Sequence, residues 1–143
     1  MAKTDLSPAE WLDKAEAYCA RAEHCAADVR RKLYEWGVPA DVFDKIEEIL
    51  YERDFLNDQR FCQAYVHDKV AYQAWGRMKI QAGLRALQLP ETIIREALEN
   101  IDEEQYSRNL RNLIQQRKAD SEDKRLRFLL QRGFGFEEIK KMQ

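Results

Sequence analysis

Apolar residues recur along this chain at three- and four-residue spacing, and one kind of turn interrupts the pattern three times. The turns read Trp36-Gly37-Val38-Pro39, Leu87-Gln88-Leu89-Pro90 and Arg132-Gly133-Phe134-Gly135. A leucine stands four residues before the second position of each turn, and apolar side chains return five and eight residues after its third position. The turns are 51 and then 45 residues apart, a period typical of helical repeat proteins.

The same pattern predicts nine helices in three groups of three, with starts and ends set by polar caps, glycines and prolines. The residues that mark these helix ends are Ser7-Pro8-Ala9-Glu10 as a capping box, Gly37, Pro39, Asn57, Asp58, Gly76, Pro90, Ser121 and Gly133. No segment alternates as a strand does. We therefore predict an all-α fold of three tandem three-helix repeats, at about 7–55, 56–101 and 102–143, stacked into an elongated array that can curve. We expect each repeat to have little core of its own.

Composition indicates a single domain without covalent staples. The chain has 143 residues, of which 35% are charged, and no run of about 20 apolar residues that could span a bilayer. Its first residues lack the apolar core of a secretory signal, so we expect a cytoplasmic protein with no membrane contact. Cys19, Cys25 and Cys62 show no CxxC spacing and are expected to be buried thiols. His67 is expected at the surface.

The sequence offers no constellation for catalysis. It has no glycine-rich phosphate loop, no HExxH or GxSxG motif, and no Cys/His cluster with metal-ligand spacing. Cys25 follows His24, but neighbours on a helix point about 100° apart and do not readily share a ligand. We predict a protein that is not an enzyme and holds neither cofactor nor metal.

Charge is distributed unevenly. Residues 1–56 hold 8 basic and 13 acidic side chains, residues 57–101 hold 6 and 5, and residues 102–143 hold 10 and 8. Basic groups lie on the middle helix of each repeat, and their members are the candidate partner-binding residues: Arg30, Arg31, Lys32, Arg77, Lys79, Arg85, Lys124, Arg125, Arg127 and Arg132. They form either an ordinary solvated face or one groove that meets an acidic protein or phosphates. Phe128 is either an exposed ring in this basic patch or part of a helix buried on two sides.

Three blocks of the sequence match the motif pattern of a known protein family. Residues 21–33, which include His24-Cys25, Asp28-Val29 and Lys32-Leu33, resemble the family pattern R-x-x-H-S-x-x-E-L followed by K-L. Residues 56–66 resemble L-x-D-x-x-F-A-x-x-Y-V, and residues 127–134 resemble R-F-L-x-x-R-G-F. Departures include Cys25 for serine, Cys62 for alanine, Ala74-Trp75-Gly76-Arg77 for the usual G-Y-G-P, Gly83 for a larger residue, and Gln88 for glycine.

These blocks resemble the RecX family of bacterial RecA regulators. The resemblance implies a protein of three tandem three-helix repeats that lodges in the groove of the RecA nucleoprotein filament, and the lack of a long heptad seam predicts a monomer. Such a protein would restrain the ATPase, recombinase and coprotease activities of RecA. Two alternatives stay open at this point. One is a helical-repeat protein that binds single-stranded or double-stranded DNA directly, and the other is an adaptor for a different protein partner.

Overall fold

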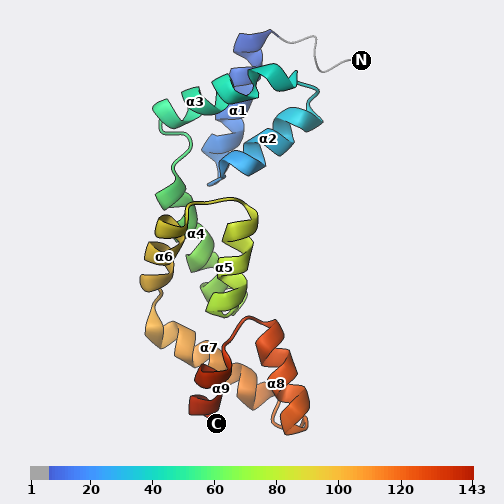
Figure 1. Cartoon of the computed structure of the whole chain (residues 1–143), viewed down its shortest axis with the longest axis vertical. Coiled ribbons are helices and arrows are strands. Elements are labelled where there is room, and N and C mark those ends of the chain that lie inside the picture. The colour runs from blue at the N-terminus through green and yellow to red at the C-terminus, as the bar shows by residue number, and fades with distance from the viewer. Residues whose placement is uncertain (1–6) are drawn as a thin grey trace. The chain divides into compact units, whose positions relative to one another are not determined.

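The computed structural model describes residues 7–143, and every regular element in that range is helical. The elements are α1 (Pro8–Arg21), α2 (Ala26–Glu35), the 3₁₀ turn η2 (Ala40–Val42), α3 (Phe43–Glu52), α4 (Asp58–Ala71), α5 (Arg77–Ala86), α6 (Glu91–Glu99), α7 (Glu103–Gln116), α8 (Glu122–Gln131) and α9 (Phe136–Met142) (Figure 1). The nine α-helices fall into three groups of three. The predicted all-α repeat fold is confirmed.

Predicted caps begin several of these helices. The Ser7 hydroxyl accepts from the Glu10 N–H at 3.3 Å, and the Ser7 N–H donates to the Glu10 carboxylate at 2.9 Å. Ser121 accepts from the Lys124 N–H at 3.2 Å. Each such bond satisfies a backbone donor that has no partner inside the helix. The capping box at α1 and the cap at α8 are therefore confirmed.

The three recurring turns adopt one conformation. Gly37, Gln88 and Gly133 have φ values of 78°, 64° and 102°. In each turn, the next residue donates its N–H to a leucine carbonyl five positions earlier: Val38 to Leu33 at 3.0 Å, Leu89 to Leu84 at 3.3 Å, and Phe134 to Leu129 at 3.2 Å. This is the Schellman ending of a helix. The apolar donor residues and the leucines are all buried, so the turn also seals each core.

The chain forms two compact units, which divide after Phe61, in the first turn of α4. In unit 1, α1, α2 and α3 enclose a core of their own, formed by Trp11, Ala15, Cys19, Val29, Leu33, Val38, Ile46, Leu50 and Leu56. The expectation that no three-helix group has much core is wrong for this group. Its α1 contributes Trp11, Ala15 and Cys19, whereas Ala22 is exposed beyond the end of the helix.

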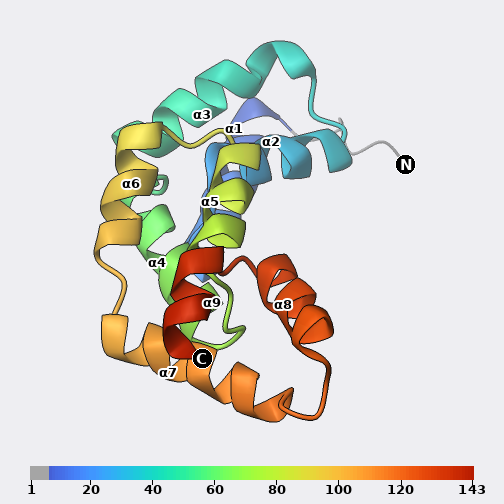
Figure 2. The same cartoon turned by 60° about the horizontal axis from the view of Figure 1, so that its bottom comes forward.

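Unit 2 contains the remaining helices, and its buried residues come from both of its three-helix groups. Ile80, Leu84 and Ile94 are fully buried in the first group, and Leu129 and Ile139 in the second. Figure 2 shows α7, α8 and α9 gathered at one end of this unit and α4, α5 and α6 at the other. The cysteines of both units are buried free thiols, as predicted, and burial raises the pKa of Cys19 to about 11.

Candidate partner-binding surface

In unit 2, the start of α5 and the end of α8 meet backbone to backbone. The Gly76 N–H donates to the Arg132 carbonyl at 2.8 Å, and the Met78 N–H donates to the Gly133 carbonyl at 3.0 Å. A Cβ atom on Gly76 would lie 2.2 Å from the Gly133 carbonyl carbon, and one on Gly133 would lie 2.5 Å from Lys79 Cβ. Only glycine permits this approach. The two central basic helices of unit 2 are therefore held in fixed register.

Arg132 strengthens this junction from its side chain. Its guanidinium donates to the carbonyl of Gln73, and to that of Ala74 at 3.3 Å. Ala74 has a φ of 52°, a left-handed conformation that glycine adopts more easily, and it occupies the first glycine position of the family motif. Through these two bonds Arg132 positions the α4–α5 loop.

The loop that Arg132 holds carries an aromatic ring between two lysines. The Nζ atoms of Lys69 and Lys79 both lie 4.4 Å from the centroid of the Trp75 ring. A lysine ammonium at this distance is attracted by the electron-rich ring face. Trp75 thus gathers two cations from α4 and α5 at the α5–α8 junction.

A second ring on α8 is arranged in the same way. The Arg117 guanidinium stacks 3.7 Å from the Phe128 centroid, and that of Arg132 lies 5.8 Å from it. Phe128 is half-buried, so it is not the exposed ring of the first alternative, although cations surround it. The second alternative also does not hold, because Leu129 is the only buried residue of α8. We define the basic face of unit 2 as Lys69, Trp75, Lys79, Arg117, Lys124, Phe128 and Arg132, with Arg127 at its border.

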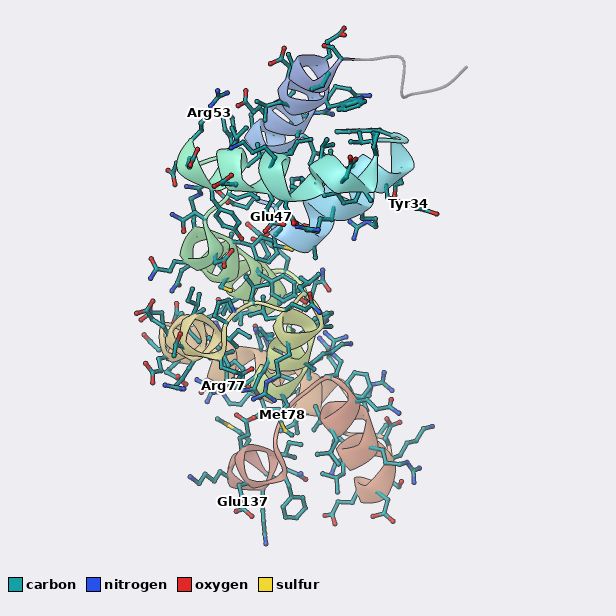
Figure 3. All side chains as sticks on the ribbon, turned by 45° about the horizontal axis from the view of Figure 1, so that its top comes forward. Tyr34, Glu47, Arg53, Arg77, Met78 and Glu137 are labelled. Atoms are coloured by element: carbon teal, nitrogen blue, oxygen red, sulfur yellow. The ribbon has the colours of Figure 1, made fainter. Side chains whose placement is uncertain are left out.

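The three candidate cations of α2 lie in unit 1 and pair with acids there. Arg30 donates to Glu47 at 2.6 Å and to Asp44 at 2.5 Å, and Glu47 lies on α3 beside α2 in Figure 3. Arg31 pairs with Asp28 at 3.4 Å, and Lys32 with Glu35 at 3.4 Å. These charges are balanced inside unit 1.

Three further candidates in unit 2 have internal partners. Arg77, at the start of α5 (Figure 3), pairs with Glu103 and Glu138 and stacks 4.3 Å from the Tyr106 ring centroid. Arg85 forms a two-bond pair with Glu91 at 2.7 and 2.9 Å. Arg125 donates to the carbonyls of residues 117 and 120 at 3.4 and 3.2 Å. Of the ten candidates, Lys79, Lys124 and Arg127 pair with no acid and donate to no carbonyl among the described residues.

Charge balance differs between the units. Residues 1–61 hold 9 basic and 14 acidic side chains, a net charge of −5, and residues 62–143 hold 15 and 12, a net charge of +3. Six of the eight cations in residues 7–61 are ion-paired, whereas in residues 62–143 only Arg77, Arg85 and Arg117 pair with an acid. Unit 2 therefore presents positive charge that the described chain does not neutralise.

Comparison with known proteins identifies the family. A model of the second three-helix domain of RecX matches residues 57–98. The Regulatory protein RecX of Chlorobaculum tepidum is 31% identical over 135 residues, an alignment that covers 90% of this chain and 83% of that protein. The chain belongs to the RecX family. It spans only 56% of the Regulatory protein RecX of Clostridium perfringens SM101, with which it is 29% identical.

The fold agrees with solved RecX structures. The crystal structure of RecX from Lactobacillus salivarius superposes with a TM-score of 0.77 at 20% sequence identity, covering 94% of this chain and 92% of that one. Among the described residues, no helix is both long and apolar enough to cross a bilayer, and no three His, Cys, Asp or Glu side chains gather as metal ligands would.

Sequence reasoning missed Lys69, Trp75 and Arg117 as members of the basic face. A signal for them was present, because residues 69–90, 105–119 and 124–136 contain no acid at all. These stretches contribute the α4–α5 loop with α5, most of α7, and most of α8 with the turn that follows it. Acid-free stretches in a chain with 35% charged residues are a stronger marker of a basic surface than runs of adjacent cations.

Proposed function

We propose that this RecX-family chain binds the RecA nucleoprotein filament and inhibits its ATPase, recombinase and coprotease activities. The observation that carries the proposal is the basic face of unit 2, whose lysines have no acidic partner in the described chain. A nucleoprotein filament exposes phosphates and acidic side chains. Cations that are not paired with acids of their own chain can bind both. The name of its relatives, Regulatory protein RecX, supports a regulatory rather than a catalytic role.

The proposed mechanism is occupancy of a surface. A protein that binds one state of a filament more tightly shifts the filament towards that state, in proportion to the difference in affinity. No covalent chemistry is needed. The proposal includes action as a monomer, in the cytoplasm and without a cofactor.

The test is titration of the chain into a RecA ATPase assay on single-stranded DNA. Arg77, Arg125 and Arg132 are unsuitable as variants, because their side chains bond other parts of the fold. Lys79→Gln with Lys124→Gln removes two charges from the basic face. Arg95→Gln with Lys141→Gln removes two exposed charges from α6 and α9 and serves as the matched control.

We expect wild-type protein and the control to inhibit ATP hydrolysis equally, and the Lys79/Lys124 variant to need a higher concentration for the same inhibition. Circular dichroism should be alike for all three, since none of the four cations pairs with an acid in the described chain. Thermal unfolding should change little, because the contact of Lys79 with the Trp75 ring contributes only about 0.5 to 1 kcal/mol. An unchanged ATPase rate at saturating wild-type protein would refute the proposed function.

A further inference from the structure

We propose that the basic face of unit 2 binds one strand of nucleic acid, with phosphates on its lysines and bases against the exposed surface of Trp75 and Phe128. This inference adds a nucleic-acid contact to the proposed function, and it can be tested without the recombinase. Its failure and the failure of filament regulation are therefore distinguishable.

The cations of this face form a line. Lys124, Phe128 and Arg132 are four residues apart on α8, so they fall along one side of the helix, over about 12 Å at 1.5 Å per residue. At the end of that line, Gly133 contacts Lys79, and Trp75 connects Lys79 to Lys69. A line of cations matches a polymeric anion, whereas a small anion would need donors that converge on one point.

The two rings favour nucleic acid over an acidic peptide. Trp75 and Phe128 are both half-buried, and cations already lie over their rings. A base that stacks on either ring would take the place of one of these cations, and the displaced cation would then meet a phosphate. Proteins that bind single strands combine a positive track with aromatic side chains on which bases stack. Carboxylates of a peptide would gain nothing from the rings.

The rings also favour a single strand over a duplex. Bases in a duplex are stacked on one another, so their faces are not available to side chains on the protein surface. In the single strand they are available beside each phosphate. A duplex would contact only the cations, without stacking on the rings, and should therefore bind more weakly than a single strand.

The face is organised before a strand arrives. Arg132 fixes the Trp75 loop through the carbonyls of Gln73 and Ala74, and the backbone bonds of Gly76 and Met78 fix α5 against α8. Side chains already held in place lose less entropy on binding. Arg132 is thus a positioning residue that presents Trp75 and its two lysines.

The experiment measures binding of a labelled oligothymidylate by fluorescence anisotropy at several salt concentrations, with no RecA present. The logarithm of the binding constant should fall linearly with the logarithm of salt concentration, and each cation removed from the face should reduce the slope by about 0.7, as for single strands. Lys79→Gln with Lys124→Gln should therefore reduce it by about 1.4. The Arg95→Gln/Lys141→Gln control should keep the wild-type slope.

A second pair of measurements tests the rings and the strand. Phe128→Leu keeps the apolar packing of α8 but removes the aromatic surface, and it should weaken oligothymidylate binding while leaving the salt slope unchanged. A duplex of mixed sequence should bind more weakly than the oligothymidylate, and polyglutamate should compete poorly.

Three results would overturn the inference. Equal losses in the control and Lys79/Lys124 variants would make net charge alone responsible. Tighter binding of the duplex would exclude base stacking as the basis of recognition. Efficient competition by polyglutamate would assign the face to an acidic protein surface.

Discussion

The two units differ in the share of their cations that pair with acids, although each also holds a lysine over a ring, Lys14 over Trp36 in unit 1 and Lys69 and Lys79 over Trp75 in unit 2. In unit 1, Arg30 joins α2 to α3 through Asp44 and Glu47, and Arg53 joins α3 to α1 through Glu16. In unit 2, Lys69 and Lys79 lie over an aromatic ring, which attracts them without neutralising their charge. An ion pair fixes one helix against another, but the acid neutralises the positive charge that a partner would otherwise meet. A cation held by a ring keeps both its position and its charge for a partner.

The units also use the same turn for different purposes. Gly37 ends α2 at an exposed position, so in unit 1 the turn needs glycine only for its left-handed backbone. Gly133 ends α8 but is buried against Lys79 and Gly76. One turn closes a helix, and the other also joins two helices. Substitutions at these positions separate the two uses.

The largest effect should come from Gly133→Ala. A left-handed conformation costs alanine about 1 to 2 kcal/mol, and overpacking at the α5 backbone adds about 1 to 3 kcal/mol. Gly37→Ala should show the first cost alone. Urea denaturation measures both, and equal losses of unfolding free energy in the two variants would show that the α5–α8 contact contributes nothing.

Thiol labelling locates the damage. Cys19 and Cys25 are buried in unit 1, and Cys62 is buried in α4 as the first residue of unit 2, so the labelling rate of each thiol reports how often the region that buries it opens. Mass spectrometry after alkylation should show that Gly133→Ala accelerates labelling of Cys62 and leaves the other two unchanged. The reverse pattern would contradict the assignment of this contact to unit 2.

The next effect should come from Tyr106→Phe. The Tyr106 hydroxyl accepts from the Arg77 N–H at 2.9 Å and donates to Glu138 at 3.1 Å, and losing these bonds should cost about 1 to 2 kcal/mol. Burial, with the nearby Glu138 carboxylate, raises the pKa of Tyr106. The folded state therefore retains this proton more strongly than the unfolded state, so stability falls as pH rises above about 10. Tyr106→Phe should flatten that alkaline fall, as stability measured from pH 8 to 11 would show; an unchanged profile would assign it elsewhere.

The fold was largely predictable because helix ends are local. Ser7 and Glu10, or Gly37 and Val38, make their bonds within a few residues, so sequence spacing alone indicates them. The face was less predictable because it depends on distant contacts. Arg132 and Ala74 are 58 residues apart, and no local pattern reveals that this arginine holds a loop while Lys79 stays free of acids. The predicted repeat boundaries and the elongated shape stay predictions.

A smaller and opposite effect should come from Gln88→Gly. Gln88 holds a φ of 64° where the other two turns have glycine, and relief of this strain should raise the unfolding free energy by about 1 kcal/mol, reduced by the extra freedom of glycine in the unfolded chain. Thermal unfolding of the variant beside wild type measures the gain. A loss of stability would mean that the Gln88 side chain makes a contribution larger than its backbone strain.

The smallest effect should come from Arg30→Gln, which tests whether the paired cations of unit 1 take part in binding. Arg30 is part-exposed, and its bonds to Asp44 and Glu47 should contribute about 0.5 to 1 kcal/mol to stability. Salt should reduce this contribution, because exposed charges are screened. Since the charge of Arg30 is already balanced by two acids, its loss should leave oligothymidylate binding and RecA inhibition at wild-type levels.

The matched comparison is Lys79→Gln, which removes one charge from unit 2 and should show the reverse, with stability kept and binding weakened. If Arg30→Gln instead weakened binding as much as Lys79→Gln, an internal ion pair would not withhold a cation from a partner, and the contrast between the two units would fail.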